Sequence, residues 1–242
     1  MERIATRRRL VAAGSLGPAG AVLKQLRASA DRSRLEGMGR FGIDTRNALG
    51  VTVTELRGLA RRIGRNHDLA AALWQSEIHE ARLLATMVDE LSSVTEAQME
   101  RWVSDLTSWD LCDQLCGNLF DRTPYAFDKA LGWSRRDEEF VKRAGFALMA
   151  TSAVHRKDVS DARFEVFLPA ISAQAMDDRN YVKKAVSWAL RQIGKRSPSL
   201  NRKAIATARE IERIDARAAR WIARDVLREL ESPAVRDRLR PR

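Results

Sequence analysis

The sequence predicts an all-α protein, an α-solenoid in which helical repeats stack into a curved domain with a concave face. Three observations predict this class. Apolar residues recur at helical spacing along almost the whole chain of 242 residues. Only 6 prolines and 13 glycines interrupt it, too few for a β protein with many tight turns. Several helices also resemble one another at a fixed offset, which is typical of repeat proteins.

The apolar periodicity divides the chain into helices joined by short polar connections. The expected helices cover 19–35, 52–65, 67–74, 77–90, 95–105, 108–120, 123–132, 136–153, 160–175, 179–196, 198–213 and 215–230. Four polar residues are expected to cap helix starts, namely Thr95, Thr123, Ser160 and Ser197. The prolines that follow two of them, Pro124 and Pro198, fit the first helical position.

The clearest internal repeat is a short match on two helices. Lys142-Arg143-Ala144 and Lys183-Lys184-Ala185 lie 41 residues apart. Helix pairs that recur at about 40 residues indicate a solenoid of HEAT or armadillo type. Chance similarity within an alanine-rich helical bundle is the alternative. We expect one repeat domain over 19–232, between a flexible basic tail at 1–18 and a basic tail at 233–242.

The chain carries a net charge of +11, from 43 basic and 32 acidic residues. A basic excess of this kind indicates a polyanionic partner, with nucleic acid first and an acidic membrane surface second. The excess lies towards the two ends, because the segment 41–190 contains 19 basic and 22 acidic side chains. Basic tails that only aid solubility are the alternative interpretation.

Membrane and metal chemistry find little support in the sequence. No stretch approaches the ~20 apolar residues of a membrane span, and glycines and a proline interrupt the apolar run near the N-terminus. We therefore expect a cytoplasmic protein without a membrane partner. Cys112 and Cys116 lack the further pair of ligands that a zinc site needs. We expect no metal and no cofactor, and interpret both cysteines as buried apolar side chains.

The helix expected over 179–196 has a basic face that carries a tryptophan. Its apolar side chains gather on one side at 100° per residue, whereas the opposite side carries Lys184, Trp188, Arg191 and Lys195. A tryptophan on a helix usually belongs to the core. A ring between cations is also what a nucleic-acid groove uses, because cations meet phosphates and the ring meets sugars or bases. The pattern leaves both interpretations open.

The helix expected over 108–120 places an aromatic ring and a carboxylate together. Trp109 and Asp113 are four residues apart and therefore share a face. Asp110 points to another side of the helix, and its place in the first turn is one where the helix dipole favours a carboxylate. A solvent-exposed Asp113 beside a half-buried Trp109 is the alternative to a functional pair. On another helix, small residues align with Arg143, which would let a bulky ligand approach the backbone.

Four segments resemble, in their order and spacing, the DNA alkylation repair glycosylases with HEAT-like repeats. They are RFGIDTRNALGVTVTELRGLARRI, SWDLCDQL, FVKRAGFALM and YVKKAVSWALRQIGKRSP. The resemblance covers residues 35–215, and its most specific parts are W-D-x-x-D and K-A-x-x-W-x-L-R. Members of this family hold duplex DNA in the concave face of the solenoid. They hydrolyse the N-glycosidic bond of cationic N3- or N7-alkylated purines, without metal, cofactor or a deep base-flipping pocket.

The same resemblance implies roles for individual residues. Trp109 and Trp188 match the aromatic pair that packs on the deoxyribose of the lesion, and Asp113 matches the catalytic carboxylate. Arg143 matches the arginine that holds the DNA backbone beside the lesion. Phe41 stands where the family commonly has a tyrosine, so that hydroxyl is missing here.

The chemistry that the resemblance implies needs few catalytic groups. A cationic alkylpurine leaves as a neutral base, so one carboxylate suffices where most glycoside hydrolases use two. We therefore expect a monofunctional glycosylase that acts as a monomer on double-stranded DNA containing alkylated bases. Its DNA contacts would be Arg143, Lys184, Arg191, Lys195 and Phe41. The alternative is a non-catalytic HEAT-repeat protein that binds damaged or branched DNA; a scaffold for a protein partner would leave the tryptophan on the basic face unexplained.

Overall fold

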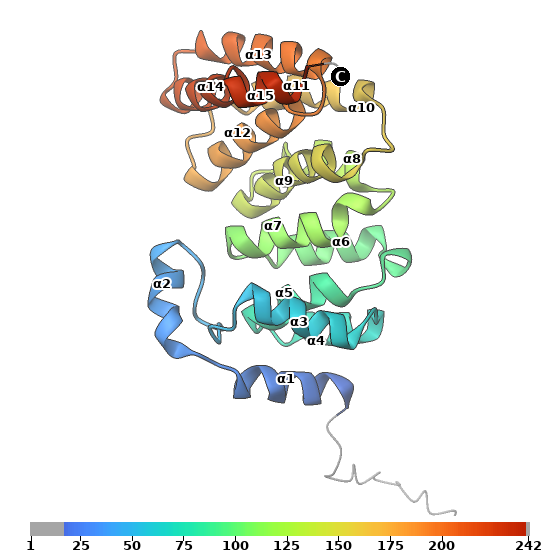
Figure 1. Ribbon diagram of the computed structural model, residues 1–242. Helices are drawn as coiled ribbons and strands as arrows, with labels where there is room; N and C mark the ends of the chain where they lie inside the picture. Colours follow the sequence, from blue (N-terminus) through green and yellow to red (C-terminus); the bar gives the residue numbers. More distant parts are fainter. Residues whose placement is uncertain (1–16, 241–242) are drawn as a thin grey trace, which may run out of the picture.

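The computed structural model describes residues 17–240, which form a stack of helices without a strand (Figure 1). None of these helices is long and apolar enough to cross a membrane. Their bounds are α1 (Pro18–Ala28), α2 (Leu35–Arg40), α3 (Val53–Ile63), α4 (His67–Gln75), α5 (His79–Val88), α6 (Glu96–Ser104), α7 (Trp109–Asn118), α8 (Ala126–Trp133), α9 (Glu139–His155), α10 (Asp161–Glu165), α11 (Phe167–Ala173), α12 (Asn180–Gly194), α13 (Pro198–Glu212), α14 (Arg217–Leu230) and α15 (Pro233–Arg238), with 3₁₀ turns η1 (Arg32–Arg34), η2 (Leu91–Ser93) and η3 (Phe120–Arg122).

The helices form two layers. In the inner layer α5, α7, α9, α12 and α14 each pack against the next, and an outer layer of α4, α6, α8, α11 and α13 covers them. The repeated triplets at 142–144 and 183–185 lie within the first two turns of α9 and α12, which are neighbouring inner helices. The predicted solenoid of HEAT-like helix pairs is confirmed.

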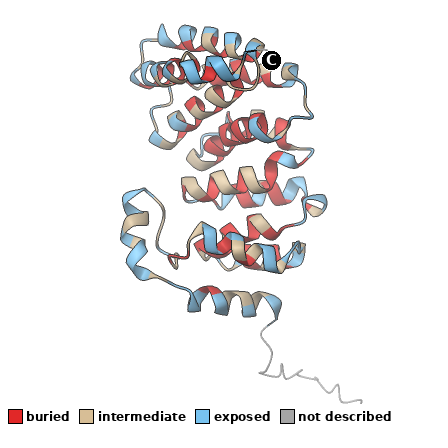
Figure 2. Ribbon diagram, in the orientation of Figure 1, coloured by how far each residue is buried: buried red, intermediate tan, exposed pale blue. Residues whose placement is uncertain are grey.

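Burial follows the predicted periodicity. Each inner helix buries its apolar face, and α9 is buried along nearly its whole length because α7, α8 and α12 surround it (Figure 2). Cys112 and Cys116 are buried free thiols, as expected, and burial raises the pKa of Cys116. In the outer layer Trp74 and Trp102 stack with ring centroids 4.1 Å apart. The core therefore runs as one layer between the two rows of helices.

The expected helix over 19–35 is interrupted in the structure. α1 ends at Ala28, and the side chain of Asp31 then caps a new turn by accepting a hydrogen bond from the Ser33 N–H at 3.1 Å. The Asp31 N–H donates to the carbonyl of Leu49 rather than continuing the hydrogen-bond pattern of α1. The following helix α2 buries none of its residues and contains two glycines, which weaken a helical pattern.

Two further boundaries differ from the sequence prediction. The segment 160–175 forms two helices, because Pro169 cannot donate a hydrogen bond to the carbonyl of Glu165. Residues 233–238, expected as part of a basic tail, form α15, which buries Val235 and places Arg238 on the carbonyl of Lys195 at 2.7 Å. The expected N-terminal tail at 1–18 lies outside the described residues except for its last two.

The expected caps are confirmed in part. The hydroxyl oxygens of Thr95 and Ser197 accept backbone hydrogen bonds in the first turns of α6 and α13, and Pro198 begins α13. Ser160 precedes α10 but makes no side-chain cap bond. The expected start at Thr123 and the following proline is wrong, because the Thr123 hydroxyl donates to the carbonyl of Phe120, the first residue of η3, and α8 begins at residue 126.

Candidate functional site

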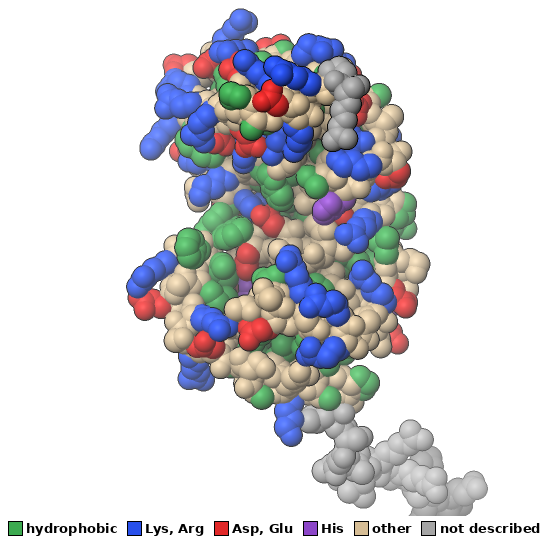
Figure 3. Space-filling model, in the orientation of Figure 1, with side chains coloured by type: hydrophobic (Ala, Val, Ile, Leu, Met, Phe, Trp, Pro, Cys, Tyr) green, Lys and Arg blue, Asp and Glu red, His purple; other side chains and the backbone are tan. Residues whose placement is uncertain are grey.

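Two open cavities, each of about 490 Å³, lie where the inner helices begin. One of them joins the end of α2 to the first turns of α7, α9 and α12, on a side where the space-filling surface is hollowed (Figure 3). We call it the aromatic pocket, and it is lined by Gly39, Arg40, Phe41, Gly42, Trp109, Arg143, Asn180, Tyr181 and Lys184. Aromatic and basic side chains line it, and none of these residues is acidic.

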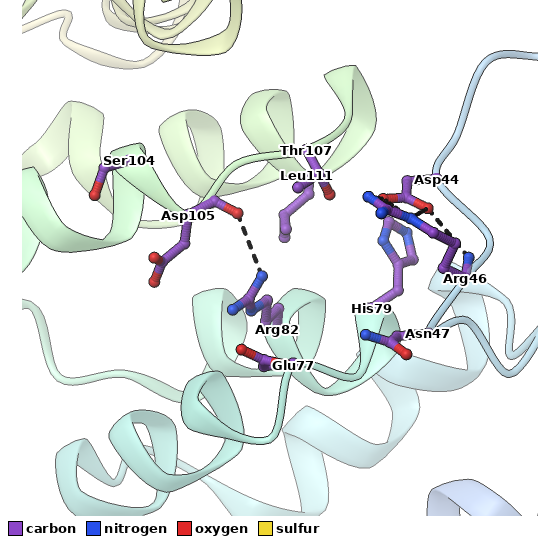
Figure 4. Close-up of a pocket in the computed structure, with 10 residues that line it drawn as sticks. All are labelled: Asp44, Arg46, Asn47, Glu77, His79, Arg82, Ser104, Asp105, Thr107 and Leu111. Atoms are coloured by element: carbon purple, nitrogen blue, oxygen red, sulfur yellow. Dashed lines mark hydrogen bonds and ion pairs between the residues drawn. The ribbon is translucent and has the colours of Figure 1, made fainter.

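The other cavity lies between the loop that precedes α3, the start of α5 and the α6–α7 connection (Figure 4). Its charges are mixed, with Asp44, Glu77 and Asp105 beside Arg46 and Arg82. A hydrogen bond from Arg46 holds the pKa of Asp44 at about 2, so this carboxyl stays ionised. Carboxylates repel phosphates, so the aromatic pocket is the better candidate for nucleic acid.

The turn after α2 is fastened to the inner helices by two aromatic side chains. The indole N–H of Trp109, the first residue of α7, donates to the carbonyl of Phe41 at 2.9 Å. The hydroxyl of Tyr181 donates to the carbonyl of Gly42 at 3.3 Å. Gly42 has φ +74°, and a Cβ there would lie 1.9 Å from the Tyr181 hydroxyl, so only glycine fits. The Phe41 ring itself is 75% exposed at the rim of the pocket.

Behind the pocket, Arg143 and Asp113 form a two-point ion pair between α9 and α7. Arg143 Nε lies 3.0 Å from Asp113 Oδ1, and Nη2 lies 2.7 Å from Oδ2. Arg143 Nη1 donates to the carbonyl of Tyr181 at 2.7 Å, which adds α12 to the unit. Burial raises the pKa of Asp113, and the charge of Arg143 opposes that rise. The shared face of Trp109 and Asp113 is as predicted, but this pairing was not.

Arg143 links the carboxylate to the pocket. Its guanidinium carbon lies 5.9 Å from the centroid of the Trp109 ring, within the range of a cation–π contact. A guanidinium has five N–H groups, and the described residues accept from three of them. Asp113 does not line the pocket, although its side chain keeps 20% exposure. A ligand in the pocket therefore meets Trp109 and Arg143 first.

The basic face of α12 divides into two parts. Lys184 is exposed on the basic face, where the helical spacing places it, and it lines the aromatic pocket. Trp188, one turn further on, is half-buried against the core, with its indole nitrogen 3.1 Å from the side-chain amide of Gln192. Trp188 thus fits part of the core interpretation and part of the nucleic-acid interpretation. It packs partly against the core, and it lies on the same face of α12 as Lys184.

Arg191 and Lys195 do not present free cations to the groove. Arg191 pairs with Glu229 and with Asp225, and Lys195 pairs with Glu229. Burial opposes ionisation of Glu229, but Lys195 and Arg191 lower its pKa, so the carboxylate stays charged. These pairs join α12 to α14. In the free protein, carboxylates of α14 therefore occupy the two cations that the sequence assigns to phosphate contacts.

The start of α7 is anchored by Asp110, which points away from Asp113 as expected. Asp110 accepts a hydrogen bond from the Ser108 hydroxyl at 2.6 Å and lies 2.8 Å from His79 Nε2. Burial lowers the pKa of His79, but the hydrogen bond and charge of Asp110 outweigh it, so the pKa is raised above its usual value. For Asp110 burial acts in the other direction and raises the pKa, but the hydrogen bond and charge of His79 outweigh burial, so the pKa of Asp110 is lowered. No sequence pattern predicts the pairing of Asp110 with His79, because the two residues lie 31 positions apart in the chain.

Sequence reasoning also missed Tyr181, although a signal was present. Tyr181 precedes Lys184 by three residues and Trp188 by seven, so all three share one face of α12. His79 and Gly42 carried no such signal, because their partners lie 31 and 139 residues away in the chain.

Taken together, the two layers of helix pairs and a basic, aromatic pocket on the inner layer define a HEAT-like solenoid with the features of a nucleic-acid-binding protein. Residues 22–230 match the family of DNA alkylation repair enzymes, and the chain belongs to this family. No curated protein gives a significant match. A similar solved structure is described as "a new family of proteins related to the HEAT-like repeat DNA glycosylases with affinity for branched DNA structures". It has a TM-score of 0.72 and 20% identity, over 87% of this chain and 94% of that one, which establishes the likeness of fold.

Proposed function

We propose that this protein is a monomeric DNA glycosylase that releases cationic N3- or N7-alkylated purines from double-stranded DNA. The observation that carries the proposal is the unit formed by Trp109, Asp113 and Arg143. An aromatic ring and a carboxylate share one face of α7, and a buried arginine fixes the carboxylate from α9. The aromatic pocket in front of this unit is open and basic, which suits a DNA backbone.

The chemistry follows from the charge of the substrate. An alkylated purine cation departs as a neutral base, and the bond cleavage leaves positive charge on the deoxyribose. Asp113 is the group that stabilises this charge and orients the attacking water. The electron-rich face of Trp109 favours the same cationic sugar by about 0.5–2 kcal/mol. Phe41, exposed at the opposite rim, offers a second apolar surface to the DNA.

Arg143 holds two roles in this mechanism. In the free protein it neutralises Asp113, and it keeps two N–H groups without a partner among the described residues. A DNA phosphate that accepts from these groups draws the guanidinium charge towards itself. The Asp113 carboxylate is then less compensated when the sugar becomes cationic. The arginine thus couples backbone binding to the charge that the reaction needs.

The test is a release assay on methylated duplex DNA in the presence of EDTA, with free bases identified by mass spectrometry. We expect 3-methyladenine or 7-methylguanine to appear at a rate that depends on protein concentration. Because no step of the mechanism uses a metal, the chelator should leave the rate unchanged. Loss of release with EDTA and its recovery with a divalent ion would contradict the mechanism, and no release at all would contradict the proposal.

The second candidate is a non-catalytic protein that binds damaged or branched DNA. The neutralisation of Asp113 by Arg143 and the position of Trp188 outside the pocket favour it. The solved structure of similar fold also belongs to proteins with affinity for branched DNA. Tight binding of a four-way junction without release of either methylated base would favour this candidate over the glycosylase.

A further inference from the structure

The last inner helix, α14, exposes a basic stripe that the candidate site does not include. Five side chains lie on its solvent side, and all five residues are exposed: Arg217, Arg220, Trp221, Arg224 and Arg228. Their spacing along the chain places them within an arc of about 100° on the helix. The opposite side is apolar and packs into the core. We call these five residues the α14 stripe.

Most of the positive charge of the stripe is available to a ligand. Arg217 and Arg224 have no carboxylate partner among the described residues, 17–240. Arg220 pairs with Asp215, whose side chain is 99% exposed, and such surface pairs contribute little. Trp221 lies among these cations and is 39% exposed, which is uncommon for so large an apolar ring. A solvated surface helix needs arginines, but it has no need of an exposed indole.

The stripe adjoins the face of α12 that leads to the aromatic pocket. The carboxylate of Asp225 accepts a hydrogen bond from Ser187 at 2.7 Å and lies 3.3 Å from Arg191, both on α12. The same carboxylate pairs with Arg228 of the stripe at 2.5 Å. α12 and α14 pack side by side, and Lys and Arg side chains gather over this end of the molecule (Figures 1 and 3). Arg191 and Lys195 of α12 are held in ion pairs, so the exposed cations on this side of the molecule lie on the next inner helix, α14.

We propose that the α14 stripe binds the phosphate backbone of a duplex arm that extends beyond the aromatic pocket. The arginines would contact phosphates, and Trp221 would pack on a sugar between them. Arg217 and Arg228 are separated by 11 residues of helix, or about 16 Å at 1.5 Å per residue. That length equals the rise of about five base pairs. The proposal rests on DNA occupying the pocket, as in the proposed function, but it needs no catalysis.

The test compares two double variants that lose the same charge. Arg217→Ala with Arg224→Ala removes the two unpaired arginines of the stripe. The control, Arg101→Ala with Arg202→Ala, removes two exposed arginines of the outer helices α6 and α13. Fluorescence anisotropy on an undamaged duplex, long enough to pass beyond the pocket, gives the affinity at several salt concentrations. Melting temperatures verify that each variant is folded.

We expect the stripe variant to flatten the slope of log K against log salt by up to about 1.8. Its affinity should fall by up to about 60-fold at ~0.1 M salt, which is the same loss expressed at that concentration. Trp221→Ala should weaken binding several-fold without changing the slope, because it removes no charge. The control should leave slope and affinity near those of the wild type, because its arginines lie on the outer layer.

Equal slopes for the stripe variant and its control would overturn the proposal. So would unchanged DNA binding combined with loss of binding to phosphatidylserine-containing vesicles, because the stripe would then serve a membrane surface. Failure of the glycosylase proposal is a separate result, since it shows as absent base release from a wild-type protein that binds DNA. Binding to undamaged DNA is the only measurement that decides the proposal for the α14 stripe.

Discussion

Arg143 is the residue that ties the candidate site together. It contacts Asp113 through two nitrogens, the backbone of Tyr181 through a third, and lies near the ring of Trp109. A lysine offers a single point charge and could not hold these partners at once. The buried pair is thus better understood as a device that fixes geometry than as a source of stability, because desolvation offsets much of its Coulomb energy.

The neighbouring cations of α12 are expected to behave differently from one another. Lys184 is exposed at the pocket, so Lys184→Ala should reduce the slope of log K against log salt by about 0.9, the value for one phosphate contact. Arg191 is held by Glu229 and Asp225, so Arg191→Ala should leave the slope within error of the wild type. Anisotropy titrations of both variants on one duplex measure this. A larger slope change for Arg191→Ala would place DNA over the seam between α12 and α14.

How far the sequence predicts single residues depends on the distance of their partners along the chain. Trp109 and Asp113 were recognised together because helical geometry alone places residues four apart on one face. The partners of Arg191 lie on the next inner helix, with Glu229 38 residues away. Their pairing depends on how α12 and α14 are aligned, which tertiary packing decides. A basic face read from one helix therefore overestimates the cations that remain free.

At the scale of elements, the position of α7 determines whether the site forms. Trp109 is its first residue, so any shift in the start of this helix moves the indole. Asp110 fixes that start through Ser108 and through His79 on α5. His79 is 6% exposed, so the link between the two inner helices is largely shielded from water.

This link makes stability depend on pH. The raised pKa of His79 means that the charged pair contributes fully below about pH 6.5, the usual histidine value, and is lost as pH rises through the folded pKa. His79→Gln should therefore destabilise the protein most at low pH, by about 1.5–3 kcal/mol for a charged hydrogen bond. Urea unfolding between about pH 5.5 and 8.5 measures the effect.

Asp110→Asn is the matched variant, because it removes the other half of the pair. The lowered pKa of Asp110 means that its contribution is present above about pH 3.8 and lost only as pH falls through its folded value. Both variants should therefore lose the same part of the wild-type pH dependence in the neutral range. A difference in stability between wild type and His79→Gln that stays constant from acid to alkaline pH would show that the pair carries no charge.

The elements themselves were largely predictable, and the exceptions have local causes. Inner and outer helices follow the apolar periodicity because each buries one face. The segment 160–175 carries the same periodicity, yet Pro169 divides it. α2 was missed because it buries nothing and so has no apolar stripe. Its importance comes from the turn that follows it, which Trp109 and Tyr181 hold across the pocket.

Across the whole molecule, the structure shows where the unevenly distributed charge of the sequence lies. The segment 191–242 carries 15 basic and 7 acidic residues, and part of this excess forms the α14 stripe rather than a tail. The slightly acidic middle of the chain contains the ion pairs that fix the inner helices, such as Arg143 with Asp113. A duplex that lies on the inner layer would thus meet a fixed carboxylate near the pocket and a row of free cations beyond it.

In the proposed mechanism Asp113 supplies the charge that drives base release, and Asp113→Asn under single-turnover conditions measures its contribution. The amide keeps the size of the carboxylate and one hydrogen bond to Arg143 but removes the negative charge. We predict that release of 7-methylguanine slows by about 10²–10³, the loss for one preorganised electrostatic group. Affinity for undamaged DNA should hold or tighten slightly, and Asp128→Asn on the exposed side of α8 should match the wild type. A folded Asp113→Asn protein that releases the base at the wild-type rate would rule out this role of Asp113.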